Sequence, residues 1–298
     1  MRIGIDLGGT KIEIAALGAG GEFALRERNA APTGDYDATV RAIRDLVVAA
    51  EAKLDRTCTV GVGIPGAISQ ATGLVKNANS TWINGKPLDR DLSAALNRQV
   101  RLANDANCFA LSEAVDGAGK GKRVVFGVIL GTGVGGGIAI DGGVLAGPNA
   151  IAGEWGHNPL PWAEPSETPG AVCYCGKSGC IETWLSGPAL SRQFAQSTSR
   201  KLAAGEIVAL AASGDGQAHA TLAAYDRRLA KSLAHLINIL DPDVIVLGGG
   251  LSNLDRLYTN VPPLLAGYAF SDKIATPIVK NRWGDSGGVR GAAWLWPG

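Results

Sequence analysis

Residues 2–18 read RIGIDLGGTKIEIAALG, and this stretch decides the expected fold. Apolar side chains alternate at Ile12, Ile14 and Ala16, which is the two-residue period of a strand with one buried face. Two glycines separate that strand from the apolar run before it. The stretch therefore predicts a strand, a glycine-rich turn and a second strand. Residues 123–143, RVVFGVILGTGVGGGIAIDGG, repeat the pattern and predict a second such hairpin.

The remaining segments alternate between strand and helix patterns, which indicates an α/β protein. Helices are expected near residues 37–54, after Asp105, near 218–240 and in the apolar C-terminal segment GVRGAAWLWP. Strands are expected in TVGVGIPGAI (59–68), VRLAN (100–104) and DPDVIVLGGGLSN (241–253). The glycine- and lysine-rich segment GAGKGK at 117–122 separates the two halves and is the expected domain boundary.

Composition excludes several classes of protein. The 298 residues are 46% hydrophobic and 18% charged with a net charge of +1, enough for two ordinary domains and without the basic stripe of nucleic-acid or membrane-surface proteins. The N-terminal sequence does not have the pattern of a signal peptide, and no run of eighteen apolar residues is present. We therefore expect a cytoplasmic protein with reduced thiols.

Three of the five cysteines fall within CYCGKSGCIE, residues 173–182. In a reducing compartment this density favours metal ligation over disulfides. Zinc takes four ligands, so Cys173, Cys175 and Cys180 need a fourth, and His157 in GEWGHNP is the nearest candidate. Four protein ligands leave no open position, which predicts a structural zinc ion. The competing interpretation is three ordinary thiols in a tight loop.

Two stretches match G-x-G-x-x-G, at residues 61–66 and 131–136, but neither opens a long helix as a dinucleotide site requires. The glycine-rich hairpins instead let backbone N–H groups approach a phosphate. Thr10 adds a hydroxyl, Lys11 a positive charge, and Asp6 could hold a water bound to magnesium. For either hairpin alone, the alternative that its glycines only form the turn has as much support as phosphate binding.

Five motifs together resemble the ROK (repressor, open reading frame, kinase) family of sugar kinases. They are DLGGTK (6–11), GTGVGGG (131–137), GEWGH (153–157), CYCGKSGCIE (173–182) and VIVLGGG (244–250), and they span nearly the whole chain in the family's order. KNANSTWINGKPL, LANDANC, EWGHNPLPW and VRGAAWLW are most similar to the family's bacterial fructokinases, which also act on mannose. The resemblance implies a fructokinase that converts fructose and ATP to fructose 6-phosphate and ADP.

The resemblance also implies the fold of actin and hexokinase, a ribonuclease H-like architecture of two α/β domains around a central cleft, here with a zinc knuckle. The terminal helix would return to the first domain, giving an N-terminal domain of residues 1–118 with 287–298 and a C-terminal domain of residues 119–286. Family members bind ATP with Mg²⁺, and many form homodimers. Others are repressors with an added N-terminal DNA-binding domain, for which Met1, directly before the first strand, leaves no room.

Phosphoryl transfer to an alcohol needs a group that accepts the hydroxyl proton. Asp105 is the candidate catalytic base because it matches the aspartate of the family's N-D motif; a plain helix N-cap is the alternative. Asn104, Glu154, His157 and Glu182 match the family's sugar-binding positions, and Asn79 is a weaker candidate with Asn77 as its rival. The expected nucleotide site comprises Asp6, Gly8, Gly9, Thr10, Lys11, Gly131, Thr132, Gly133, Gly248, Gly249 and Gly250.

The zinc and sugar predictions are connected through His157. If zinc binds one imidazole nitrogen, the other carries a proton that can be donated to a sugar hydroxyl. The same loop would place Glu182. Three alternatives to a fructokinase stay open: an N-acetylglucosamine kinase or glucokinase of the same family, a sugar-responsive regulator without catalysis, and an actin-like assembly protein. Whether residues 84–92 contact substrate or only cap a helix also stays open.

Overall fold

The computed structural model describes residues 1–297 and divides the chain into two compact units. The first unit contains Met1–Gly127, Gly137–Gly153 and the segment from Arg282 onward, and the second contains Val128–Gly136 and Glu154–Asn281. The predicted domains, 1–118 with 287–298 and 119–286, stay predictions, and position 298 lies outside the described residues.

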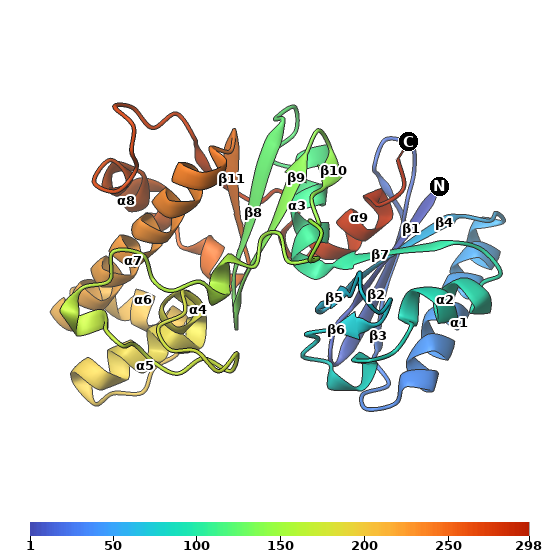
Figure 1. Ribbon diagram of the computed structural model, residues 1–298, viewed down its shortest axis with the longest axis horizontal. Coiled ribbons are helices and arrows are strands. Elements are labelled where there is room, and N and C mark those ends of the chain that lie inside the picture. The colour runs from blue at the N-terminus through green and yellow to red at the C-terminus, as the bar shows by residue number, and fades with distance from the viewer. Residues whose placement is uncertain (298) are drawn as a thin grey trace. The chain divides into compact units, whose positions relative to one another are not determined.

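The first unit is built on a five-stranded sheet in the order β3-β2-β1-β4-β7 (Figure 1). Its strands are β1 Arg2–Leu7, β2 Lys11–Leu17, β3 Phe23–Ala30, β4 Thr59–Ile64 and β7 Val100–Asn104. β1 pairs antiparallel with β2 and parallel with β4, and β4 pairs parallel with β7. The predicted strand, glycine-rich turn and strand at the N-terminus is therefore confirmed.

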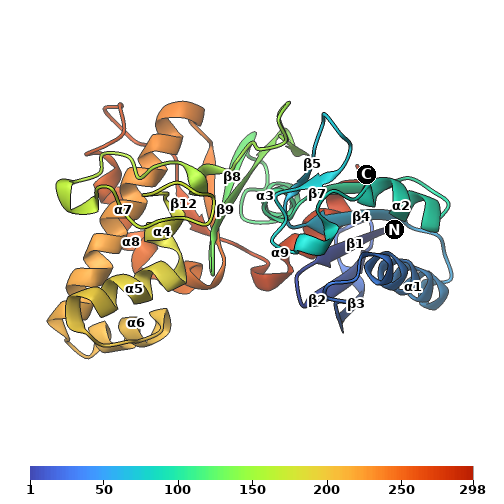
Figure 2. The same cartoon turned by 60° about the horizontal axis from the view of Figure 1, so that its bottom comes forward.

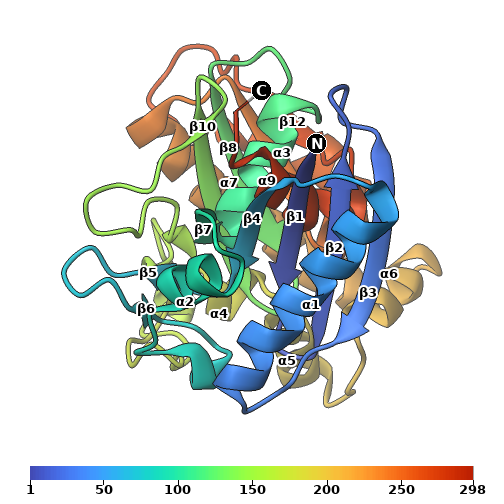
Figure 3. The same ribbon diagram turned by 90° about the vertical axis from the view of Figure 1, so that its right-hand side faces the viewer.

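Four helices cover the two faces of this sheet. They are α1 Tyr36–Leu54, α2 Leu88–Ala95, α3 Asp105–Val115 and α9 Gly287–Trp294. Figure 3 shows α1 and α2 across one face, with α3 and α9 behind the sheet on the other. The helices expected near 37–54, after Asp105 and at the C-terminus are confirmed, and α2 accounts for much of the segment 84–92.

Glycines in two central strands explain why α9 packs so closely on the sheet. A Cβ added at Gly4 in β1 would lie 2.0 Å from the Val289 carbonyl oxygen, and one added at Gly61 in β4 would lie 1.9 Å from that of Ala292. Both distances are far below van der Waals contact, so a side chain at either position would displace α9. Gly61 belongs to one of the two unassigned G-x-G-x-x-G matches, which therefore has a packing role.

The short elements of the first unit lie at its loops. They are β5 Ala67–Ile68, β6 Val75–Lys76, and the 3₁₀ helices η1 Thr81–Ile83 and η5 Gly284–Ser286. β5 and β6 form a two-stranded antiparallel ribbon. The loop that follows this ribbon carries Asn77 and Asn79.

A second sheet has the order β10-β9-β8-β11-β12. Its strands are β8 Val124–Leu130, β9 Val134–Ile140, β10 Gly143–Val144, β11 Val244–Gly248 and β12 Ile278–Lys280. The boundary between the two units falls inside β8 and β9. The second predicted glycine-rich hairpin is confirmed by β8 and β9, and the predicted strand before the three glycines is β11.

The helices of the second unit gather around the long α7, whose buried side chains include Leu222, Tyr225, Leu229 and Leu233. The helices are α4 Glu182–Leu185, α5 Gly187–Thr198, α6 Ala204–Ala212, α7 Gly216–Leu240 and α8 Arg256–Leu265, with 3₁₀ turns η2 Trp155–His157, η3 Pro165–Glu167 and η4 Gly250–Asn253. Figure 2 shows α4, α5 and α6 beside α7, and each contacts it. The helix expected near 218–240 is confirmed.

Within residues 1–297, no helix combines the length and the apolar character that crossing a membrane requires.

Candidate functional site

The start of α3 holds Asn104 and Asp105 in different roles. Asn104 is the N-cap: its Oδ1 accepts hydrogen bonds from Ala106 N at 2.9 Å and from Asn107 N at 3.3 Å. Its Nδ2 donates to the Gly66 carbonyl oxygen at 3.1 Å, which ties the cap to the turn after β4. The alternative that made Asp105 the plain N-cap is therefore wrong.

Asp105 occupies the first turn of α3 and is exposed to solvent. Its Oδ1 accepts from Ala106 N at 2.8 Å. The positive end of the helix dipole favours the ionised carboxylate at this position. Asp105 is thus a solvent-accessible carboxylate held at the rigid start of a helix. A side chain that accepts a proton needs such a fixed and accessible position.

Asp6 stands at the end of β1, half-buried, immediately before the first glycine-rich turn. Burial raises its pKa to about 7; the negative charges of Asp105 and Glu13 add to the rise, while Arg28 opposes it. Asp6 and Asp105 are therefore close enough for their charges to repel. A cation near Asp6 would relieve that repulsion.

A pocket of about 230 Å³ lies at this turn. It is lined by Asp6, Gly8, Lys11, Glu13, Arg28 and Asp285. The structure thus brings together three of the residues predicted to bind nucleotide, with basic and acidic neighbours that the sequence did not single out. Glu13 and Arg28 could have been linked through the pairing register of β2 and β3, which sets them opposite each other. Glu13 Oε2 accepts from Arg28 Nε at 2.7 Å.

The loop that carries Asn77 and Asn79 is held by a residue that sequence reasoning missed. Asn84 bonds both polar backbone groups of Ala78: Ala78 N donates to its Oδ1 at 2.9 Å, and its Nδ2 donates to the Ala78 oxygen at 2.8 Å. Asn77 has a φ of 58°, a left-handed conformation that asparagine tolerates well. The left-handed backbone therefore gives a structural reason for an asparagine at position 77, and the side chains of Asn77 and Asn79 are both exposed.

In the second unit, η2 places Glu154 and His157 on one short turn. Trp155, between them, is buried and donates from Nε1 to the Gly135 oxygen at 2.8 Å. A Cβ at Gly156 would lie 2.1 Å from the Val134 oxygen, so the turn packs directly on the start of β9. Glu154 itself is exposed.

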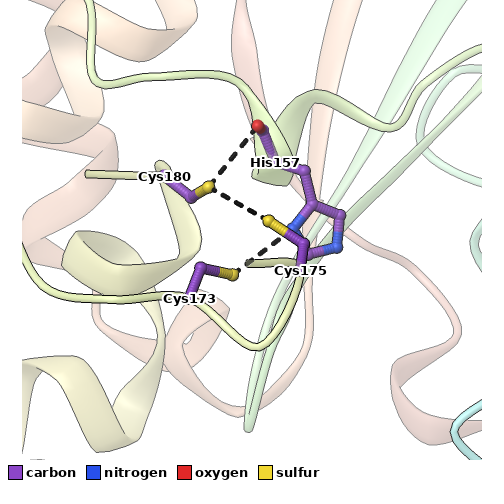
Figure 4. A group of neighbouring side chains, drawn as sticks. All are labelled: His157, Cys173, Cys175 and Cys180. Atoms are coloured by element: carbon purple, nitrogen blue, oxygen red, sulfur yellow. Dashed lines mark hydrogen bonds between the residues drawn. The ribbon is translucent and has the colours of Figure 1, made fainter. Parts of the chain in front are cut away.

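The cysteine-rich loop brings four candidate ligands together. The Sγ atoms of Cys173, Cys175 and Cys180 and a ring nitrogen of His157 all lie within 4.8 Å of one another. Figure 4 shows the four side chains pointing toward one another. Cys173 Sγ lies 3.6 Å from His157 Nδ1, and Cys175 Sγ lies 3.6 Å from Cys180 Sγ. Gly176, at φ 87°, makes the turn that returns the chain.

Two of these distances match those between the ligands of a tetrahedral zinc ion. With Zn–S bonds of about 2.3 Å and a Zn–N bond of about 2.0 Å, tetrahedral ligands lie roughly 3.5–3.8 Å apart. The contacts of 3.6 Å from Cys173 Sγ to His157 Nδ1 and from Cys175 Sγ to Cys180 Sγ fall in that range. Three sulfurs and one imidazole are also the ligand types that zinc prefers. The donor set is therefore compatible with structural zinc.

Glu182 links this loop to the second glycine-rich turn. Its Oε2 accepts from Val134 N at 2.9 Å, at the start of β9. Five residues later, Gly187 N donates to the Gly131 oxygen at 2.8 Å. Gly249 also packs closely, since a Cβ there would lie 2.4 Å from the Leu130 oxygen. Gly131 and Gly249, both predicted to bind nucleotide, thus lie in one region with Glu182. No local sequence pattern indicated this connection.

Comparison with known proteins gives the family. The chain matches the ROK family over residues 2–298. An N-acetyl-D-glucosamine kinase of Photobacterium profundum is 42% identical over 299 residues, covering 99% of both chains. One from Shigella flexneri is 41% identical with the same coverage.

Solved structures agree in fold over the whole chain. A ROK hexokinase from Thermus thermophilus has a TM-score of 0.86 at 29% identity, covering 99% of this chain and 97% of the other. A ROK family glucokinase from Streptomyces griseus, in complex with glucose and AMPPNP, has a TM-score of 0.76 at 28% identity, covering 99% and 98%. The predicted hexokinase-like two-domain α/β fold is confirmed.

The prediction of a fructokinase is wrong as the leading interpretation, because the relatives at 40–42% identity over the full length are N-acetyl-D-glucosamine kinases. The physical reason is that kinases of different hexoses need the same chemistry for hydroxyl recognition and phosphoryl transfer, so motifs expected to serve that chemistry do not separate them. The predicted family is confirmed: the chain belongs to the ROK family, as one of its sugar kinases.

Proposed function

We propose that this protein is an N-acetyl-D-glucosamine kinase that transfers the γ-phosphoryl group of ATP to a hydroxyl of the sugar and releases ADP. Relatives that carry this name at 42% and 41% identity support the choice of sugar. The observation that carries the kinase chemistry is the exposed Asp105 carboxylate at the start of α3, beside its cap Asn104.

Asp105 is the proposed catalytic base. It accepts the proton of the attacking hydroxyl as the oxygen bonds to the γ-phosphorus and the bond to ADP breaks. Asn104 donates one amide hydrogen to the Gly66 carbonyl oxygen, and it can donate the other to a sugar oxygen. Because the cap locks Asn104 in place, its amide group is already oriented before substrate arrives.

Nucleotide binding is proposed for both glycine-rich turns. In the first unit, Asp6, Gly8, Gly9, Thr10 and Lys11 would take part, and in the second, Gly131, Thr132, Gly133, Gly248, Gly249 and Gly250. Mg²⁺ bound with ATP would neutralise phosphate charge. The raised pKa of Asp6 supports a cation here, since a divalent ion would favour its ionised form.

Sugar recognition is proposed for Asn79, Asn104, Asp105, Glu154, His157 and Glu182. Carboxylates and amides on fixed turns suit a ligand with several hydroxyls, because charged acceptors make strong hydrogen bonds. His157, Cys173, Cys175 and Cys180 are the proposed ligands of a structural Zn²⁺ ion, which would hold the imidazole in one tautomer and orientation. The homodimer that the resemblance implies stays a prediction.

The test is ADP release by the purified protein with ATP and Mg²⁺, measured against N-acetylglucosamine, glucose, mannose and fructose. We expect the highest kcat/KM with N-acetylglucosamine. A higher value with another of these sugars would overturn the proposed substrate but keep the kinase. Failure of all four sugars to stimulate ATP consumption would overturn the kinase activity itself.

A further inference from the structure

Tyr174 lies between two of the cysteines of the ligand cluster, in the sequence Cys173-Tyr174-Cys175. Its side chain is 83% exposed, an unusual position for a large aromatic residue. The hydroxyl nevertheless turns back to lie 3.0 Å from His157 Nε2. The two rings meet edge to face, with centroids 5.1 Å apart and an interplanar angle of 88°.

The surroundings of Tyr174 are those of the proposed sugar site. The negative charges of Glu182 and Glu154 both reach the phenol. Tyr174 therefore stands near both carboxylates proposed to bind sugar. The hydroxyl itself contacts His157, the third of these residues proposed to bind sugar.

The contact uses the imidazole nitrogen that the proposed function assigns to the substrate. His157 Nδ1 faces Cys173 Sγ at 3.6 Å, so a metal ion on Nδ1 leaves the proton on Nε2. That N–H then donates to the Tyr174 oxygen. A single N–H cannot make two full-strength hydrogen bonds, so Tyr174 and a sugar hydroxyl compete for it.

We propose that Tyr174 gates the sugar site: its hydroxyl takes the place of a sugar hydroxyl on His157 in the free enzyme and leaves when the sugar binds. This inference rests on the proposed role of His157 in sugar recognition. Departure is easy, because an exposed ring loses little buried area when it rotates about χ1. The closed state is held by one hydrogen bond and one edge-to-face contact.

Competition of this kind lowers apparent affinity by the fraction of molecules in the open state. A hydrogen bond of ordinary net strength corresponds to roughly a two- to tenfold effect. Tyr174→Phe keeps the ring and removes the hydroxyl. We therefore expect the Kd and KM for the sugar to fall about two- to tenfold, with kcat and the KM for ATP unchanged.

The experiment is calorimetric titration of wild type and Tyr174→Phe with each of the four sugars, together with steady-state kinetics and metal content per chain. Tyr36→Phe is the matched control, since it also loses a tyrosine hydroxyl bond, to Asp91 at 2.6 Å, away from the cysteine loop. Equal metal content in the three proteins ensures that affinity changes do not reflect zinc loss.

Tighter sugar binding by Tyr174→Phe alone would support the gate. Weaker binding would overturn it, because the hydroxyl would then contact the bound sugar, and unchanged binding would overturn it too. If wild type binds another hexose, the gate is tested with that sugar and only the proposed substrate fails. If wild type binds none of the four, the proposed function fails, and the gate fails with it.

Discussion

The two units hold their candidate carboxylates under contrasting conditions. In the first, burial and then repulsion by Asp105 raise the pKa of Asp6 to about 7. In the second, Glu182 accepts a hydrogen bond from Val134 N and fixes the start of β9. We expect the two carboxylates of the first unit to act on a cation and a proton, and Glu182 to act by fixing a turn. Substitution of Asp105 should therefore affect chemistry first, and changes around Glu182 should affect binding first.

The sharpest test of this comparison, with the largest expected effect, is Asp105→Asn. The amide keeps the acceptor oxygen that bonds Ala106 N but cannot take up a proton. We expect kcat to fall about 10²–10⁴-fold, with the Kd for sugar and nucleotide within a few-fold of wild type. Coupled kinetics and calorimetry measure both. Asp45→Asn, an exposed position on α1, is the control. Retention of a tenth or more of kcat would exclude Asp105 as the base.

A second test uses the raised pKa of Asp6, which follows first from burial and then from repulsion by Asp105. The folded pKa of Asp6, about 7, lies above its ordinary value of 3.8. Between these values the folded state holds a proton that the unfolded state has lost, so wild-type stability falls as pH rises through this window. We expect Asp6→Asn to be about 2–4 kcal/mol more stable than wild type at pH 8 and no more stable near pH 3.

The measurement is urea unfolding of both proteins at pH 3, 6 and 8 without Mg²⁺. Adding Mg²⁺ at pH 8 should stabilise wild type more than Asp6→Asn if the ion contacts this carboxylate. A stability difference that stays the same from pH 3 to pH 8 would contradict the raised pKa.

Short stretches of sequence are enough to single out both carboxylates as candidates. Asp105 matches the N-D motif of the family at a strand-to-helix junction, and Asp6 precedes a glycine turn. The cysteine cluster is equally local apart from His157. Contacts between separate segments could not be predicted from the sequence. Examples are the bond between Glu182 and Val134, 48 positions apart, and the bond between Asn84 and the loop before it. The sugar was mispredicted because shared hydroxyl-binding motifs do not encode the group that distinguishes one hexose from another.

Removing the proposed zinc ion tests the second unit. Without that ion, His157 and the loop that leads to Glu182 would lose a common anchor. We expect the sugar Kd to rise about 10–100-fold, the size of effect seen when the support of a metal site is lost. Nucleotide affinity should fall less, because the first hairpin closes through its own bond from Gly8 N to the Lys11 oxygen.

Chelation followed by metal analysis and calorimetry measures this, with zinc restored as the control. Cys175→Ser should reproduce the loss, whereas Cys58→Ala, which removes a buried thiol elsewhere, should not. Unchanged sugar affinity in protein shown to be free of metal would mean that the cluster does not shape the sugar site.

The smallest expected effect concerns the link between Glu182 and the second turn. A Cβ at Gly133 would lie 2.7 Å from Glu182 Oε2, so Gly133→Ala must push that carboxylate aside, which its flexible side chain allows. At Gly131 nothing lies within 4 Å of an added Cβ, so Gly131→Ala is the matched control. We expect Gly133→Ala to weaken sugar binding about two- to fivefold, because the bond from Val134 N to the carboxylate is strained rather than lost. Calorimetry without nucleotide isolates this effect from any contact of either glycine with ATP. If Gly131→Ala weakens sugar binding as much as Gly133→Ala does, Glu182 is not the connection between the turn and the sugar.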